Sequence, residues 1–152
     1  MAIRESACEY IFGNVQEVNM EETIQEYKRM SDKHLEMFLV MYFWVRNLNN
    51  GKRIGDFLRD QGYRHIAIYG AGYMGRCLCE ELVKEDIGID YFIDKRDMGE
   101  IMSISVKKAE DDLEPVDAVI VTSVYFIYEI EKELKQIMCC PIFSLSDIVY
   151  KL

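Results

Sequence analysis

The stretch HIAIYGAGYMGRCLCEEL, residues 65–82, decides the fold that we predict for this chain. Ile66 and Ile68 alternate as in a β-strand, and Leu78 and Leu82 are spaced as on one face of a helix. Between them lies a glycine-rich turn of the form G-x-G-x-x-G, made of Gly70, Ala71, Gly72, Tyr73, Met74 and Gly75. A strand, such a turn and a helix, in this order, are typical of a binding site for a nucleotide pyrophosphate.

Each glycine has a physical role in that interpretation. Gly70 permits the tight turn, Gly72 lets the backbone approach the pyrophosphate without an intervening Cβ, and Gly75 lets the helix pack closely on the strand. The free amides and the positive end of the helix dipole would then hold the phosphates. We therefore predict that all six residues of the turn contribute to cofactor binding. The alternative is a degenerate turn that serves fold geometry alone.

A second strand pattern, IDYFID at 89–94, ends in Asp94, where the ribose-binding acid of a dinucleotide site is expected. A carboxylate there accepts hydrogen bonds from both ribose hydroxyls and would repel a 2′-phosphate, which favours NAD over NADP. Lys95 and Arg96 oppose this preference, because either cation could reach that phosphate. NAD is the predicted cofactor, with NADP or another nucleotide as alternatives. Asp94 could instead be merely solvated at the end of a strand.

Strand and helix patterns alternate through the rest of the chain, after a short helix at 52–62. Strands are predicted at 65–69, 89–94, 101–105, 117–123 and 141–145, with helices at 73–85, 107–113 and 125–138. Near-continuous apolar strands separated by helices indicate a parallel sheet covered on both faces. The predicted fold is α/β: a Rossmann-like, doubly wound parallel sheet of about five strands in the order 3-2-1-4-5, preceded by a long N-terminal helix.

Ligands of such sheets bind over the carboxyl ends of the strands. Thr122 and Ser123 end the predicted fourth strand, so they are candidates for contacting a nicotinamide or a substrate, as is Tyr125. Small polar residues after a strand are also ordinary in loops, and the sequence does not separate these two interpretations.

The N-terminal third predicts one long helix. Residues 1–18 show no clear period and are treated as a tail, residues 19–50 as the helix, and residues 51–152 as the nucleotide-binding domain. Asn19 and Glu22 have the form of a capping box. Semi-polar and apolar residues then recur in steps of three and four, at Ile24, Tyr27, Ser31, His34, Phe38, Met41, Val45 and Leu48.

The second half of this helix is apolar on every side, with Met37, Leu39, Tyr42, Phe43 and Trp44 joining the stripe. A helix that packs on one side only does not need apolar residues on every side, so we infer burial on two sides, by the domain and by a second subunit. We therefore expect a homodimer formed through the helix of residues 19–50. The alternative is a helix that is buried within its own subunit.

Composition narrows the classes of partner. The chain has 152 residues, a formal net charge of −9 and a pI of about 4.8, so nucleic acid and anionic membranes are poor partners. The most apolar run, residues 37–45, is about half the length of a membrane span. No signal-peptide pattern opens the sequence, and we expect a cytoplasmic protein without a membrane span.

Catalytic and metal-binding patterns are weak. Tyr128 and Lys132 form a Tyr-x-x-x-Lys pair like that of short-chain dehydrogenases, but they follow the fourth strand directly and no serine lies at the usual distance upstream. The pair is a weak candidate, and no catalytic residue is assigned. No metal site is predicted either, because the spacing of the cysteines at 77, 79, 139 and 140 differs from that of a zinc knuckle.

Several stretches carry a resemblance to a known group of proteins: YRHIAIYGAGYMGRCLCEEL, YFIDK, VDAVIVTS and PIFSLSDIV. The chain resembles bacterial Rossmann-like NAD(P)-binding domains, also described as nucleoside-diphosphate-sugar epimerase-like, which occur beside or fused to glycosyltransferases of surface-polysaccharide synthesis. It is also similar to the small N-terminal domain of sugar-nucleotide acetyltransferases. The resemblance implies a role in glycan or sugar-nucleotide metabolism and a glycosyltransferase or glycan-synthesis partner.

Three functions stay open at this point. The first is a binding module for NAD(H) in sugar-nucleotide or surface-glycan metabolism, without self-contained catalysis, because no substrate domain follows the sheet. The second is a regulatory domain that senses redox state or a nucleotide. The third is a minimal sugar-nucleotide epimerase or oxidoreductase whose site is completed across a dimer.

Overall fold

The structure, a computed structural model, describes the backbone of residues 2–152 and the side chains of residues 20–152. It divides into two compact units, Met1–Phe38 and Leu39–Leu152. The first consists of the N-terminal part of the long helix α1 (Ala2–Asn49), and the second holds the end of α1 and an α/β domain. The predicted α/β class and the long N-terminal helix are therefore confirmed.

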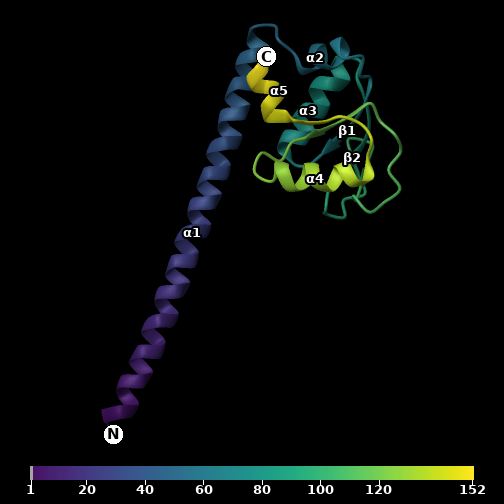
Figure 1. The fold of residues 1–152 in the computed structure, drawn as a ribbon. Coiled ribbons are helices and arrows are strands. Elements are labelled where there is room, and N and C mark those ends of the chain that lie inside the picture. The colour runs from purple at the N-terminus through teal and green to yellow at the C-terminus, as the bar shows by residue number, and fades with distance from the viewer. Residues whose placement is uncertain (1) are drawn as a thin grey trace. The chain divides into compact units, whose positions relative to one another are not determined.

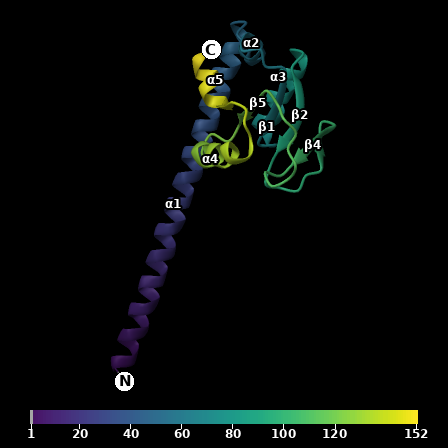
Figure 2. The same cartoon turned by 45° about the vertical axis from the view of Figure 1, so that its right-hand side comes forward.

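The second unit is built on a mostly parallel sheet with the strand order β3-β4-β2-β1-β5-β6. Every pairing is parallel except that of β3 with β4. Figure 2 shows β5, β1, β2 and β4 side by side in this order. The bounds are β1 (His65–Tyr69), β2 (Gly88–Ile93), β3 (Glu100–Ile101), β4 (Ile104–Lys107), β5 (Ala118–Val121) and β6 (Ile142–Ser144).

The predicted order of five strands, 3-2-1-4-5, is not matched exactly, because the sheet has a sixth strand, β3, at its edge; the five parallel strands keep the predicted order. The error lies at residues 101–105, where the apolar pattern predicted one strand. Met102 and Ser103 have φ values of 55° and 63°, so the chain reverses there and forms the hairpin of β3 and β4. Non-glycine residues rarely adopt positive φ, and the sequence gives little sign of this turn.

Helices cover both faces of the sheet, as Figure 1 shows for α3 (Tyr73–Lys84) and α4 (Ile127–Ile137). Ala67 and Tyr69 of β1 share a buried cluster with Ile130 and Leu134 of α4. Ile68, which points to the other face, lies beneath α3, 3.5 Å from the position that a Cβ at residue 75 would take. Burial on both faces explains the near-continuous apolar strands.

Two helix predictions need correction, and one helix was not predicted. The helix predicted at 107–113 is absent, because Asp111 accepts a hydrogen bond from the Lys108 amide (2.7 Å) and closes a turn instead. Residues 145–151 form a helix, α5 (Leu145–Lys151), that was not predicted. α1 begins at Ala2 and not at Asn19, since an asparagine inside a helix costs less than about 1 kcal/mol; the Asn19 side chain, and with it the capping box, lies outside the described residues.

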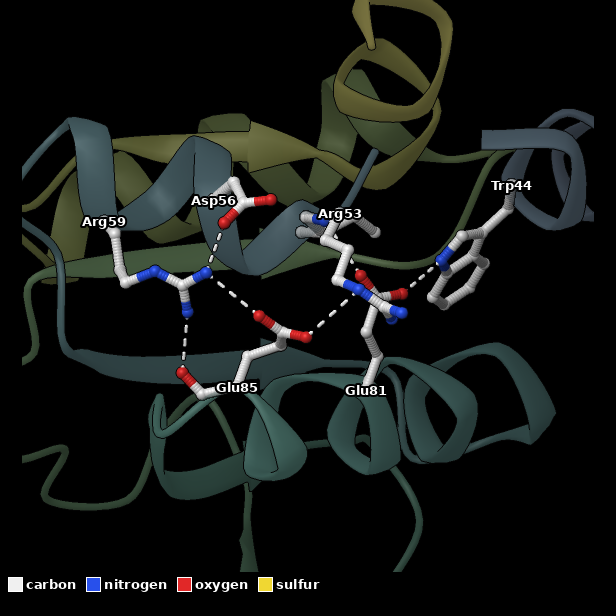
Figure 3. Close-up of polar contacts among 7 residues, drawn as sticks. Trp44, Arg53, Asp56, Arg59, Glu81 and Glu85 are labelled. Atoms are coloured by element: carbon white, nitrogen blue, oxygen red, sulfur yellow. Dashed lines mark hydrogen bonds and ion pairs between the residues drawn. The ribbon is translucent and has the colours of Figure 1, made fainter. Parts of the chain in front are cut away.

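The end of α1 is joined to the domain through a buried carboxylate, as Figure 3 shows. Trp44 is buried, and its indole Nε1 donates a hydrogen bond to Glu81 of α3. The second oxygen of Glu81 accepts a hydrogen bond from the amide of Ile54 (2.8 Å), the first residue of α2 (Ile54–Asp60), which has no side-chain cap of its own. One carboxylate thus links three helices.

A second, more exposed carboxylate on α3 reinforces this junction. Glu85 pairs with Arg53 (3.3 Å) and with Arg59 (2.9 Å), one on each side of it in Figure 3. The Asn47 side chain also donates a hydrogen bond to the Val149 carbonyl (2.7 Å), so α5 packs beside the end of α1. Among the residues that the structure describes, none of the helices combines the length and the apolar character needed to cross a bilayer.

Candidate functional site

The glycine-rich turn connects β1 to α3 with two glycines that the fold itself requires. Gly70 has a φ of 102°, and a Cβ there would lie 2.4 Å from Oγ1 of Thr122. A Cβ at Gly75 would lie 1.9 Å from the carbonyl oxygen of Gly70. A side chain at Gly70 would strain the backbone and force the Thr122 side chain to move, and one at Gly75 would force the turn or α3 to move. The positive φ at Gly70 fits the tight turn predicted for the first glycine, and the close approach at Gly75 fits the packing predicted for the third.

Gly72 differs from the other two. Its backbone angles, φ −82° and ψ −162°, suit any residue. A Cβ built there meets no atom within 4 Å. The fold therefore does not need a glycine at residue 72, and its missing side chain leaves open space directly before the first turn of α3.

The start of α3 presents unobstructed amides to that space. Gly72 is the N-cap residue, so no side chain caps the helix, and no acidic residue occupies its first turn. The amides of the first turn have no partners within the helix, and the helix dipole adds partial positive charge. The side chains of Ala71 and Met74 are buried, so these two residues offer the site mainly their backbone, whereas the Tyr73 side chain is exposed.

Asp94 lies at the end of β2, as predicted, but its carboxylate is already occupied. One oxygen accepts hydrogen bonds from the Ala71 amide (2.9 Å) and from Nη2 of Arg96 (2.9 Å). The other accepts hydrogen bonds from the backbone amide and Nε of Arg96, both at 3.0 Å. Four donors fill the acceptor capacity of a carboxylate. The Arg96 guanidinium and the two amides hold the pKa of Asp94 well below its usual range, although partial burial opposes this shift.

This arrangement changes the role expected for the acid. The Asp94 side chain is largely buried, and it ties the glycine-rich turn to the end of β2 through Ala71. It can accept ribose hydroxyls only if Arg96 moves away. The Arg96 side chain is 61% exposed and is free to do so. Sequence reasoning named Arg96 as a cation near the site but missed its pairing with the acid two residues before it.

A pocket of about 520 Å³ opens beside this acid, over the carboxyl ends of β1, β2 and β5. Four of the residues predicted to bind a cofactor line it: Gly70, Asp94, Lys95 and Ser123. The sequence missed the wall contributed by Phe126 and α4, since only the tertiary fold brings that helix here. The complete lining is Tyr69, Gly70, Asp94, Lys95, Arg96, Ser123, Phe126, Glu129, Ile130 and Glu133.

The pocket carries charges of both signs. Lys95 and Arg96 stand on the β2 side, and Glu129 and Glu133 stand on α4. The phenol of Tyr69 lies at the base, where burial, and to a lesser degree the charges of Glu133 and Asp94, raise its pKa. A ligand with an aromatic ring and anionic groups could place the ring near Phe126 and the anions near Lys95 and Arg96.

The remaining candidates do not line this pocket. The Thr122 hydroxyl is used within the fold, because it donates a hydrogen bond to the Tyr69 carbonyl (2.9 Å). Tyr128 is 83% exposed and Lys132 is exposed as well, and neither lines the pocket. In the part of the chain that the structure describes, no group of three or more His, Cys, Asp or Glu side chains is placed to hold a metal ion.

Comparisons of the chain with protein-family models, with curated proteins and with solved structures gave no match.

Proposed function

We propose that this chain is a nucleotide-binding module whose ligand is a dinucleotide of the NAD(H) type, bound over the carboxyl ends of β1, β2 and β5. Its pyrophosphate lies on the amides that begin α3, and its adenosine occupies the pocket lined by Asp94, Arg96 and Phe126. The module binds its ligand and does not catalyse a reaction by itself.

The observation that carries this proposal is the difference between the three glycines of the turn. Packing explains Gly70 and Gly75, since a Cβ at either would collide with neighbouring atoms. Packing does not explain Gly72, where a side chain would meet only open space. A ligand that approaches the backbone closely supplies the missing reason for a glycine, and free helix amides at the same point favour an anionic group.

The pairing of Asp94 with Arg96 leaves two ways to hold the ribose. If Arg96 swings out, the freed carboxylate accepts the two hydroxyls of an unphosphorylated ribose, as in an NAD site. If Arg96 stays, its guanidinium meets a 2′-phosphate, as in an NADP site. NAD remains the first expectation from the sequence, and the ion pair makes NADP a close competitor.

The proposal of binding without catalysis follows from the side chains around the pocket. The Tyr128 and Lys132 pair does not line it, and the polar groups that do are carboxylates, cations and a serine without a histidine partner. Turnover of a UDP-sugar that disappears in a Tyr128→Phe variant would contradict this part of the proposal and restore the enzyme interpretation.

The biological setting rests on sequence resemblance alone. The stretches shared with domains found beside glycosyltransferases support a role in sugar-nucleotide or surface-glycan metabolism. A glycosyltransferase or another glycan-synthesis protein is the partner that this setting implies.

Calorimetric titration of the purified chain tests the proposal. NADH, NADPH, ADP, CoA and UDP-glucose are titrated separately under the same conditions. Binding of NADH or NADPH at micromolar concentration, with weaker binding of ADP, is expected, because ADP keeps the adenosine and pyrophosphate but lacks the second nucleoside. Absence of heat with every adenine-containing compound would overturn the proposal. Binding of UDP-glucose without binding of any adenine-containing compound would show that the ligand is a uridine nucleotide and not an adenine nucleotide.

A further inference from the structure

The first unit, described by itself, is a helix with an apolar stripe along one side. The stripe consists of Met20, Ile24, Tyr27, Ser31, His34 and Phe38, which follow one another in alternating steps of four and three residues. Met30 and Leu35 flank it. The large apolar side chains of this group are 47–70% exposed. Exposed apolar side chains of this number on a single helix are typical of an interaction surface.

The spacing shows what kind of surface covers the stripe. Alternating steps of four and three give a mean repeat of about 3.5 residues, the period at which helices supercoil around each other with side chains interlocked. A sheet or an irregular surface does not require this period over several turns. The stripe therefore fits another helix that runs along it.

We propose that this other helix is residues 20–38 of a second copy of the chain. Two polar residues, Ser31 and His34, interrupt the stripe at neighbouring positions. A partner with a continuous apolar stripe would bury both against hydrocarbon, at a cost in free energy. When two copies pair symmetrically about this part of the helix, Ser31 and His34 of one copy face the same two polar residues of the other. Polar residues at such seams fix register and the number of chains.

The charges beside the stripe are compatible with self-pairing. In the positions that flank the seam between residues 20 and 38, only Glu21 and Lys28 are charged, one acid and one base. Thr23, Met30, Leu35 and Met37 fill the other flanking positions without charge. Two copies of an acidic chain with a net charge of −9 can therefore meet here without rows of like charges in contact.

This proposal confines the contact to the first half of the predicted helix of residues 19–50, although the expectation from sequence rested on the all-apolar second half. The all-apolar region of residues 37–45 is explained in part by the domain itself, because Val40 and Trp44 are buried within the second unit. The contact between copies is assigned to the stripe of residues 20–38. It is independent of the nucleotide site, so either proposal can fail without the other.

Light scattering coupled to size-exclusion chromatography tests the inference on the full chain. The double variant Ile24→Gln/Phe38→Gln removes two apolar side chains from the stripe, and glutamine is a good helix former, so helix propensity is kept. The matched control Glu22→Gln/Arg29→Gln changes two exposed residues on the opposite side of the same helix. Both variants keep the net charge of the wild type, because the control loses one acid and one base.

We expect the wild type and the control to have about twice the 17.9 kDa mass of one chain at micromolar concentration, and the stripe variant to have the mass of one chain. The dimer dissociation constant of the stripe variant should be at least about tenfold higher than that of the wild type. Fluorescence of the sole tryptophan, Trp44, which is buried in the second unit, verifies that the domain stays folded. A wild-type mass of one chain, a mass above two chains, or a stripe variant that remains dimeric would each overturn the inference.

Discussion

Asp94 shows how a single side chain acquires two roles. Its carboxylate joins the glycine-rich turn to β2 through the Ala71 amide, and it is neutralised by Arg96. The first contact belongs to the fold, whereas the second lies at the mouth of the candidate nucleotide pocket. The two roles can be separated experimentally, because each depends on a different partner.

Replacing Asp94 by asparagine should destabilise the chain at neutral pH by about 1–3 kcal/mol, because an amide NH2 would then face one of the buried donors. Since the folded pKa of Asp94 is lowered, the stabilisation by its charged form is complete above the unfolded pKa of about 3.8. It declines only as the pH falls from there towards the lower folded pKa. Urea unfolding of the wild type and the variant should therefore give a constant difference from neutral pH to about pH 5, and a smaller one in stronger acid.

Asp97→Asn is the matched control for this prediction, since Asp97 is an exposed acid three residues further along. It should change the free energy of unfolding by no more than about 0.5 kcal/mol. An equal effect of the two substitutions, or a difference that vanishes between neutral pH and about pH 5, would show that the Asp94 contacts do not stabilise the turn.

Arg96→Ala should change the choice of cofactor. The substitution frees two of the four acceptor positions on Asp94 for ribose hydroxyls, plus a third if the residue 96 amide shifts, and it removes the cation that would meet a 2′-phosphate. The preference for NADH, measured as the dissociation constant of NADPH divided by that of NADH, should therefore rise by about tenfold or more. Calorimetry with both compounds measures this ratio, and an unchanged ratio would exclude Arg96 from the ribose subsite.

At the scale of single elements, α3 contributes both to the candidate site and to the junction with α1 and α2. Its first turn presents amides beside Gly72, and its last turns carry Glu81, which binds Trp44 of α1 and the first amide of α2. The sequence indicates the first of these features through its glycines. It holds a weaker signal for the second: Glu81 is a charged residue on the helix face of Leu78 and Leu82, where a carboxylate needs a buried partner.

Glu81→Gln should lower the free energy of unfolding by about 1–3 kcal/mol, because the new NH2 group would oppose one of two buried donors, Trp44 Nε1 or the Ile54 amide. The neighbouring Glu80→Gln makes the same change of charge at an exposed position and should have an effect below about 0.5 kcal/mol. Chemical unfolding followed by Trp44 fluorescence compares them. Equal stabilities of the two variants would contradict the account of this junction.

Local patterns predicted the elements that depend on local chemistry. β1, the turn and α3 follow directly from the spacing of isoleucines, glycines and leucines, and all three formed within a residue of the predicted bounds. The hairpin at Met102 and Ser103 could not be predicted in the same way, because positive φ at non-glycine residues is imposed by the surrounding structure. The α4 wall of the pocket depends on tertiary packing, which no short pattern describes.

At the scale of the whole molecule, the chain joins two units for which we propose separate functions. Residues 20–38 carry a stripe that fits a second helix, and the α/β domain carries the candidate nucleotide site. The boundary between these units falls inside α1, which continues through both, so the predicted boundary between residues 50 and 51 did not reveal it. The burial of Val40 and Trp44 and the hydrogen bonds of Trp44 and Asn47 distinguish the part of α1 that belongs to the domain.

The central claim is that Gly72 is a glycine for the sake of a ligand. Gly72→Ala adds a methyl group where the fold has room and the backbone angles suit alanine, so the free energy of unfolding should stay equal or rise by about 0.4–1 kcal/mol. The same methyl group would stand against the pyrophosphate, so calorimetry should show NADH and NADPH affinities at least about tenfold lower than in the wild type and in the exposed-site control Gln136→Ala. A Gly72→Ala protein that is stable and binds as tightly as the wild type would contradict the claim.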